Sequence, residues 1–258
     1  MIDVTDLSSI PPEIEQAVAE YTYNLPHNAI SSIKSATIKN DLDVRCAIER
    51  FFAPGKAEIL YKKVIASLEK CDICCFHATR LVEENDVWAN GLQTNSPERY
   101  FARLSSSMQK LGIQQKSTEE AIELVKHEYN RKYGGRKPQL CFFTPIDLIS
   151  DDELAGYDQF CQNIGGELAR WSLKKKMPGV YQQLAKSGFA AIVEFGFYFS
   201  DMTSGDKDRI AYQFITHYAS KKFFNRSYPI CFDANTDKDV LPVQIIKIHR
   251  YCGEMDYE

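Results

Sequence analysis

The sequence lacks the features that mark fibrous, disordered, secreted or membrane-spanning proteins. Its 258 residues hold only 13 glycines and 10 prolines, too few for a collagen-like or low-complexity chain. No run approaches the roughly 18 apolar residues of a membrane span. The opening MIDVTDLSSI has no basic segment followed by an apolar one, as a signal peptide would. We therefore expect a globular, cytoplasmic protein with no membrane association.

Neither sign of charge is in large excess. Lys and Arg number 31 against 35 Asp and Glu, which gives a formal net charge of -4. A generic nucleic-acid coat protein would be strongly basic, so this class is disfavoured. Aromatic residues make up 12% of the chain, more than a solvated, disordered chain carries.

The signatures of several common enzyme classes are also missing. The sequence has no Gly-x-x-x-x-Gly-Lys-Ser/Thr phosphate loop, and no Gly-x-Gly-x-x-Gly follows an expected strand. It has no His-Glu-x-x-His zinc helix and no Gly-x-Ser-x-Gly nucleophile elbow. These absences disfavour P-loop, Rossmann, zincin and α/β-hydrolase chemistry.

Among the 8 cysteines, only Cys71, Cys74 and Cys75 cluster, beside Asp72 and His77. A zinc site of the usual kind needs a second ligand pair further along, and none follows. Strand alternation would also place Cys74 and Cys75 on opposite faces, whereas Cys75 and His77 would share one. That thiol and imidazole have no visible orienting partner. We therefore expect reduced, buried thiols and no metal.

The spacing of apolar residues and the positions of Gly, Pro and capping residues predict a helical N-terminal part, followed by strands that alternate with helices. Pro97 and Gly91 give boundary signals, and Ser117 with Glu120 reads as a capping box. Helices are expected at about 13–21, 40–52, 56–69, 83–89, 97–111, 117–132, 151–173, 178–187 and 207–224, with an interruption near Gly165 and Gly166. Strands are expected at 71–78, 140–144, 190–201, 228–234 and 243–251.

This order of elements predicts an α+β fold. A helical N-terminal region, 1–70, would precede a domain at 71–258 built on a mixed, mostly antiparallel, split β-sheet with interleaved helices. The two regions could also form one continuous compact unit, because no low-complexity linker divides them.

The most distinctive segment begins with Cys75-Phe76-His77-Ala78-Thr79-Arg80-Leu81 and ends, after a short helix, with Asn90-Gly91-Leu92. A strand that ends on a histidine, then a helix and a Gly-Leu turn, resembles the opening motif of the ADP-ribosyltransferase-like superfamily. The similarity is to its histidine-bearing branch, which includes poly-ADP-ribose polymerases and nucleic-acid-modifying toxins. It implies NAD as the substrate and a bacterial toxin or defence role.

The resemblance also implies roles for individual residues. His77 would hydrogen-bond the nicotinamide-side ribose, and Thr79 would line the pocket beside it. Arg80 would pair with the pyrophosphate, since a planar guanidinium suits phosphate oxygens. Phe143, or its neighbour Phe142, would stack where the superfamily usually has a tyrosine.

The superfamily places its catalytic glutamate on a later strand, and two residues compete for this role. Glu194 lies on an expected strand, and Glu167 follows the glycine pair at 165–166. The string around Tyr198, Gly-Phe-Tyr-Phe-Ser, resembles one in the polymerases, although theirs precedes the catalytic glutamate. Each of these residues also has a plain structural alternative, such as core packing, helix capping or a solvent-facing position.

Two local cationic runs interrupt the balanced charge, and either could contact the phosphates of a nucleic-acid acceptor. They comprise Lys174, Lys175 and Lys176, and then Lys221, Lys222 and Arg226. The sequence therefore favours a transferase that moves ADP-ribose from NAD to a macromolecular acceptor. Two alternatives remain: a non-enzymatic interaction module on the same fold, and a nucleic-acid-binding or nuclease component.

Overall fold

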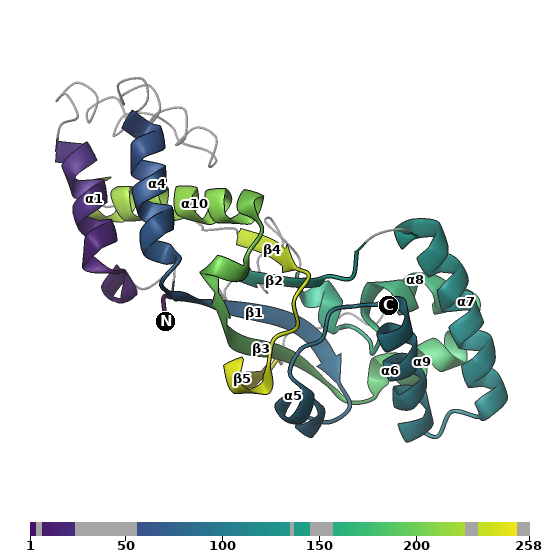
Figure 1. Ribbon diagram of the computed structural model, residues 1–258. Helices are drawn as coiled ribbons and strands as arrows, with labels where there is room; N and C mark the ends of the chain where they lie inside the picture. Colours follow the sequence, from purple (N-terminus) through teal and green to yellow (C-terminus); the bar gives the residue numbers. More distant parts are fainter. Residues whose placement is uncertain (4–6, 24–55, 135–136, 145–156, 225–231, 252–258) are drawn as a thin grey trace. The chain divides into compact units, whose positions relative to one another are not determined.

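The computed structural model describes residues 1–3, 7–23, 56–134, 137–144, 157–224 and 232–251 (Figure 1). Its α-helices are α1 (Pro12–Tyr23), α4 (Lys56–Leu68), α5 (Asn85–Asn90), α6 (Pro97–Lys110), α7 (Gln115–Tyr133), α8 (Gly166–Leu173), α9 (Pro178–Lys186) and α10 (Ser204–Phe224). Its strands are β1 (Asp72–Leu81), β2 (Leu140–Thr144), β3 (Phe189–Tyr198), β4 (Phe232–Thr236) and β5 (Ile245–Arg250). The expected α+β class is confirmed.

The strands form one sheet in the order β4-β2-β1-β3-β5. β1 pairs antiparallel with β2, with Phe76 opposite Phe143, and β3 pairs antiparallel with β5. The central strands β1 and β3 carry nearly continuous runs of buried residues, as strands covered on both faces do. Their less buried positions alternate near their ends, and His77 and Glu194 are among these positions.

The chain divides into two compact units, and neither is continuous in sequence. The first comprises 1–74 and 197–232, and the second comprises 75–196 and 233–258. In the first unit, α1, α4 and α10 pack against one another. The Tyr218 hydroxyl donates a hydrogen bond of 3.0 Å to Glu15. The expected helical region 1–70 thus shares a unit with a helix from much later in the chain.

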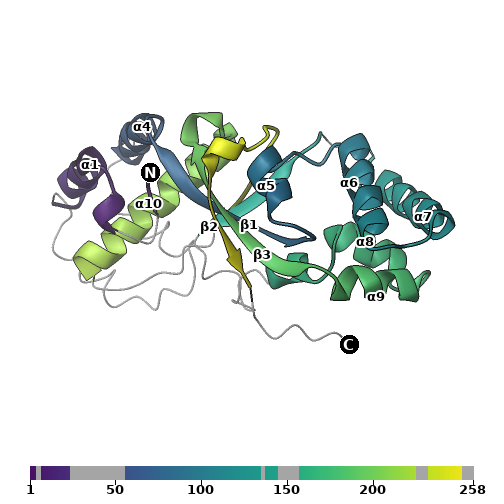
Figure 2. The same ribbon diagram turned by 90° about the horizontal axis from the view of Figure 1, so that it is seen from below.

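The second unit holds most of the sheet and a group of helices, α6 to α9, with its own apolar core (Figure 2). Leu104 and Met108 of α6 meet Val125 of α7 and Leu168 of α8 in this core. α6 begins as the sequence predicts, because Ser96 accepts a hydrogen bond from the Arg99 amide and Pro97 occupies the first turn.

The expected capping box at Ser117 and Glu120 is wrong. α7 begins earlier, at Gln115, with Gln114 in the N-cap position, and the Thr118 amide donates to the Gln114 carbonyl at 2.9 Å. Thr118 is only 1% exposed, and Ile113 is also buried. Packing of this first turn into the helical core therefore outweighs the local capping signal.

Most other element boundaries agree with the expectations to within a few residues. Within the expected helix 151–173, the described residues form a 3-10 helix, Tyr157–Cys161, and then α8. Gly165, in the N-cap position, and Gly166, the first residue of α8, both have positive φ. Strand 190–201 ends at Tyr198 and continues as a 3-10 helix, Phe199–Asp201. The expected helix 40–52, and the starts of the elements expected at 151 and 228, lie outside the described residues.

The segment that resembles the superfamily motif folds as a strand, β1, followed by a short helix, α5, and a tight turn. α5 ends at Gly91, whose amide donates to the Val87 carbonyl and whose φ is +68°. Leu92 then exchanges two backbone hydrogen bonds with Val240, at 3.0 and 2.8 Å. A Cβ atom on residue 91 would overlap the Val240 carbonyl oxygen. Glycine is therefore required here both for its φ and for the close approach of another chain segment.

Candidate functional site

His77 lies on β1, and its half-buried ring is fixed by a neighbouring strand. The Nδ1 atom is 2.7 Å from the backbone carbonyl oxygen of Cys141 on β2. A carbonyl oxygen only accepts hydrogen bonds, so Nδ1 must carry the hydrogen in the neutral ring. Nε2 is then the acceptor nitrogen, with a lone pair available to a hydroxyl donor.

Burial lowers the pKa of His77 below its ordinary value, and the positive charge of Arg103 acts in the same direction. The hydrogen bond to the Cys141 carbonyl opposes these two effects without overcoming them. The neutral ring is therefore the favoured form near neutral pH, and it retains the tautomer described above.

Arg103, on α6, is a cation whose charge helps to lower the pKa of His77. One of its terminal nitrogens donates to the side-chain oxygen of Asn95 at 2.6 Å. Desolvation, together with the like charge of Arg99 one turn earlier, lowers the pKa of Arg103. Arg103 thus acts on His77 through its charge and bonds the segment that contains Asn95.

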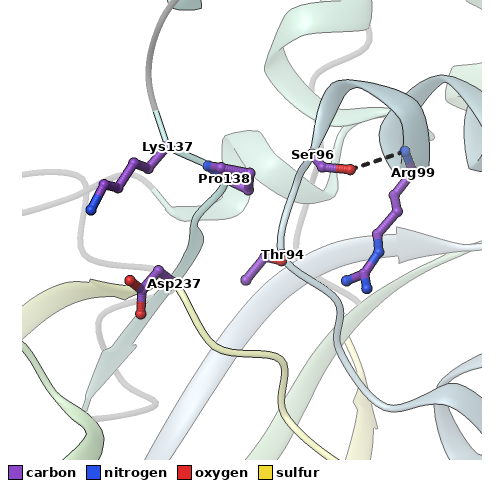
Figure 3. Close-up of a pocket in the computed structure, with 6 residues that line it drawn as sticks. All are labelled: Thr94, Ser96, Arg99, Lys137, Pro138 and Asp237. Carbon is purple, nitrogen blue, oxygen red and sulfur yellow. Dashed lines mark hydrogen bonds between the residues drawn. The ribbon is translucent and has the colours of Figure 1, made fainter.

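A surface pocket with a volume of about 420 Å³ lies beside this segment. It is lined by Thr94, Ser96, Arg99, Lys137, Pro138 and Asp237. In Figure 3, Lys137 and Asp237 stand on one side of the pocket, Ser96 and Arg99 stand on the other, and Thr94 lies between them. The lining therefore combines cations, a carboxylate and hydroxyl groups from three separate chain segments.

Asp239 ties two of these segments together. One of its oxygens accepts hydrogen bonds from the amide and the hydroxyl of Thr94, at 2.8 and 2.9 Å. Arg99 contacts both carboxylate oxygens, at 3.0 and 2.7 Å. Partial burial alone would raise the pKa of Asp239, but the bonds from Thr94 and Arg99 together hold it below its ordinary value. Asp239 is therefore an ionised anchor of the pocket wall.

The two candidate catalytic glutamates lie on different elements, and neither contacts His77 within the described residues. Glu194, on β3, is 2.7 Å from Nε2 of His249 on β5. The His77 ring hydrogen-bonds to β2, whereas Glu194 contacts β5. The sheet order places β2 and β5 on opposite sides of the β1–β3 pair. Glu167 lies in the first turn of α8, 3.9 Å from Arg170. Desolvation raises the pKa of Glu167.

Arg80 and Phe143 lie in the interior of the second unit. Arg80 is only 9% exposed, and its guanidinium donates to the carbonyl oxygens of Ser187 at 2.7 Å and Cys161 at 3.2 Å. Phe143 is 1% exposed and packs against Phe76, with ring centroids 6.1 Å apart. In this structure both side chains are engaged in packing and hydrogen bonding within the protein.

The remaining predicted site residues are spread over the chain. Thr79 is half-buried on β1, near His77. Tyr198, at the end of β3, is 50% exposed and belongs to the first unit. Lys174, Lys175 and Lys176 are exposed just after α8. Lys221 and Lys222 lie on α10, and Arg226 lies outside the described residues.

Sequence reasoning missed the pocket residues Arg99, Lys137 and Asp237, and also Arg103, which bonds Asn95. One signal was present: Arg99 and Arg103 are four residues apart on an expected helix, so they had to share a face. The contributions of Lys137 and Asp237 carry no such signal, because they depend on where distant segments meet.

No helix in the described ranges has both the length and the apolar character that crossing a bilayer requires. The same ranges contain no group of three His, Cys, Asp or Glu side chains arranged to hold a metal ion, and Cys71, Cys74 and Cys75 form no disulfide bond there. Comparisons of the chain with protein-family models, curated proteins and solved structures find no match.

The lowered pKa of His77 predicts a specific pH dependence of stability. Unfolded histidine titrates near 6.5, so below that pH the unfolded chain takes up a proton that the folded protein resists. The stabilising effect is present above this value and is lost as pH falls towards the folded pKa. We expect a His77→Asn variant to lose less stability than the parent between about pH 7 and about pH 5.5 in urea titrations. Equal losses would contradict the half-buried, neutral ring.

Proposed function

We propose that the chain is an ADP-ribosyltransferase-like protein of the cytoplasm, which uses NAD⁺ to modify a macromolecular acceptor. The supporting observation is the placement of His77. Its ring is held by the Cys141 carbonyl at 2.7 Å, and Arg103 lies nearby. The acceptor nitrogen Nε2 suits a ribose hydroxyl, which is the role that the sequence resemblance implies for this residue.

The reaction would break the bond between ribose C1′ and the nicotinamide nitrogen and form a bond between C1′ and the acceptor nucleophile. Nicotinamide leaves as a neutral molecule, and the nucleophile releases its proton to a base or to solvent. Positive charge develops on the ribose ring in the transition state, so a fixed ribose and a nearby carboxylate are the main requirements. His77 would fix the ribose, and Glu194 or Glu167 would supply the carboxylate.

The test is NAD⁺ consumption by the purified protein. A His77→Ala variant should consume NAD⁺ at least about tenfold more slowly, since losing one positioning hydrogen bond costs about 1.5 kcal/mol. His127→Ala is the matched control, because His127 is exposed on α7. Circular dichroism would establish that both variants are folded. Equal turnover by the parent and the His77 variant would overturn the role of His77.

A second candidate, a non-enzymatic binding module, is favoured by the positions of the two glutamates. Glu194 is engaged by His249, and Glu167 lies on α8 beside Arg170. A protein that binds ADP-ribose through His77 but leaves NAD⁺ intact under all conditions would support this candidate. If NAD⁺ is consumed, turnover is compared in Glu194→Gln and Glu167→Gln. The catalytic carboxylate is the one whose substitution causes the larger loss of turnover.

The acceptor would be a protein or a nucleic acid. Lys174, Lys175 and Lys176 follow α8 as exposed cations, and cations of this kind contact nucleic-acid phosphates in a salt-dependent way. Binding of single-stranded RNA that weakens steeply with salt would support a nucleic-acid acceptor.

A further inference from the structure

The walls of the pocket beside α6 are connected by hydrogen bonds in the protein without a ligand. The Asn95 amide donates to the Gln139 carbonyl oxygen at 3.1 Å, which joins the segment before α6 to the segment before β2. Asp239 joins the segment after β4 to the same region, because it accepts hydrogen bonds from Thr94 and Arg99. The three segments that line the pocket are therefore fixed relative to one another, which lowers the entropic cost of binding a ligand.

Two charged side chains of the pocket lining, Lys137 and Asp237, have no partner in the part of the chain that the structure describes. Neither forms a hydrogen bond or an ion pair there, and they do not pair with each other. Figure 3 shows both on the same side of the pocket, Lys137 from the segment before β2 and Asp237 from the segment after β4. An ammonium group and a carboxylate that are both unpaired here offer partners to a ligand that carries both signs of charge.

Arg99 supplies hydrogen-bond donors on the opposite side of the pocket (Figure 3). Its Nη1 atom contacts both carboxylate oxygens of Asp239, at 3.0 and 2.7 Å. Within the described residues, the Nε and Nη2 atoms have no acceptor, so their hydrogens remain available. Because Asp239 already balances the charge of Arg99, this side of the pocket suits an uncharged acceptor oxygen.

The charges around the pocket cancel. Lys137 and Arg99 each carry a positive charge, and the carboxylates of Asp237 and Asp239 are negative. A phosphate or a dicarboxylate would meet two carboxylates here, and a polyamine would meet two cations. An apolar molecule would leave Lys137 and Asp237 without partners. The charge pattern therefore favours a ligand that is neutral overall but carries one group of each sign, which is a zwitterion.

We propose that the pocket binds a free α-amino acid with an uncharged polar side chain. The carboxylate of the ligand pairs with Lys137, and its ammonium group pairs with Asp237. These two groups are attached to one carbon atom of an α-amino acid, in agreement with the placement of Lys137 and Asp237 on one side of the pocket. The side-chain oxygen of the ligand accepts a hydrogen bond from Arg99 on the other side.

The size of the pocket agrees with this class of ligand. Its volume of about 420 Å³ falls within the range of small-molecule sites. The transfer of ADP-ribose involves no free amino acid, so this inference goes beyond the proposed function and does not depend on it.

The test is an NMR titration of the nitrogen-15-labelled full chain with L-glutamine as the probe. We expect saturable shifts of the backbone amide signals of Thr94, Ser96 and Asp237. Three analogues each lack one group of the probe: N-acetyl-L-glutamine has no ammonium group, L-glutamine α-amide has no carboxylate, and L-norvaline has no side-chain oxygen. Each should bind at least about fivefold more weakly than L-glutamine, the effect of losing one polar contact at a partly exposed site.

Each charged side chain is tested with the analogue that lacks the matching group. Asp237→Asn should weaken L-glutamine binding at least about fivefold and leave N-acetyl-L-glutamine binding unchanged or tighter. Lys137→Gln should weaken L-glutamine binding by a similar factor and leave binding of the α-amide unchanged or tighter. Asp208→Asn and Lys116→Gln are the matched controls, because Asp208 is exposed on α10 and Lys116 is exposed on α7. Neither control should change binding.

Four results would overturn the proposal. L-glutamine shifts no pocket signal of the parent, or inorganic phosphate binds at the pocket more tightly than L-glutamine. Asp237→Asn or Lys137→Gln leaves L-glutamine binding unchanged or weakens its matching analogue by the same factor. L-norvaline binds as tightly as L-glutamine, which would remove the polar side chain from the proposal. None of these measurements involves NAD⁺, so their outcome is independent of the proposed transferase.

Discussion

A Gly91→Ala variant is expected to lose about 2–5 kcal/mol of unfolding free energy, which combines the cost of positive φ with that of a steric overlap. Gly91 has a φ of +68°, and an added Cβ would collide with the Val240 carbonyl oxygen. Backbone atoms cannot turn aside as a side chain can, so the Leu92–Val240 pairing must shift. Urea titration of the parent and the variant measures the loss.

Gly112→Ala is the matched control for this variant. Gly112 has a similar φ of +71°, but nothing lies within 4 Å of an added Cβ. Its substitution should cost only about 1–2 kcal/mol, the price of the backbone conformation alone. If both variants lose the same unfolding free energy, the close approach of Val240 does not contribute to the loss in Gly91→Ala.

The second large effect is expected at Arg80. An Arg80→Met variant should lose about 2–4 kcal/mol, because the carbonyl oxygens of Ser187 and Cys161 each lose a charged donor in a buried setting. Arg80→Lys, which restores one donor, should fall between the parent and Met. Thermal and urea unfolding measure the series.

Arg131→Met is the control here, because Arg131 forms an exposed ion pair with Glu128 within α7 and should change stability by less than about 0.5 kcal/mol. The Arg80 series also separates two roles for this residue. If Arg80→Met retains full stability but loses ADP-ribose binding, Arg80 acts on the pyrophosphate as the resemblance implies, and its structural role is refuted.

Local sequence signals predicted the elements well wherever they were strong. Ser96 and Pro97 marked the start of α6, and Gly91 marked the end of α5, because capping and positive φ are decided within a few residues. The capping box at Ser117 failed, since burial of Ile113 and Thr118 settled where α7 begins. Propensity yields to packing when a whole turn lies in the core.

The candidate site was harder to predict than the fold, for a physical reason. His77 was expected at the end of a strand and does lie on one, but β1 continues beyond it to Leu81. Its partner, the Cys141 carbonyl, is 64 residues away. The Asp239 contact to Arg99 joins residues 140 apart. Such pairings depend on sheet order and on where connecting segments cross, and a single sequence does not encode either in a local pattern.

The discontinuity of the first unit has a consequence for synthesis on the ribosome. Tyr218 of α10 bonds Glu15 of α1 across 203 residues, and the buried face of α10 includes Ile210, Phe214 and Ile215. At about 5–20 residues per second, α1 and α4 must wait about 10–40 s for α10 to be made. During that interval their apolar faces are exposed in the nascent chain. We therefore expect early stalls in translation to yield chains that need a chaperone, whereas a stall after α10 emerges would not.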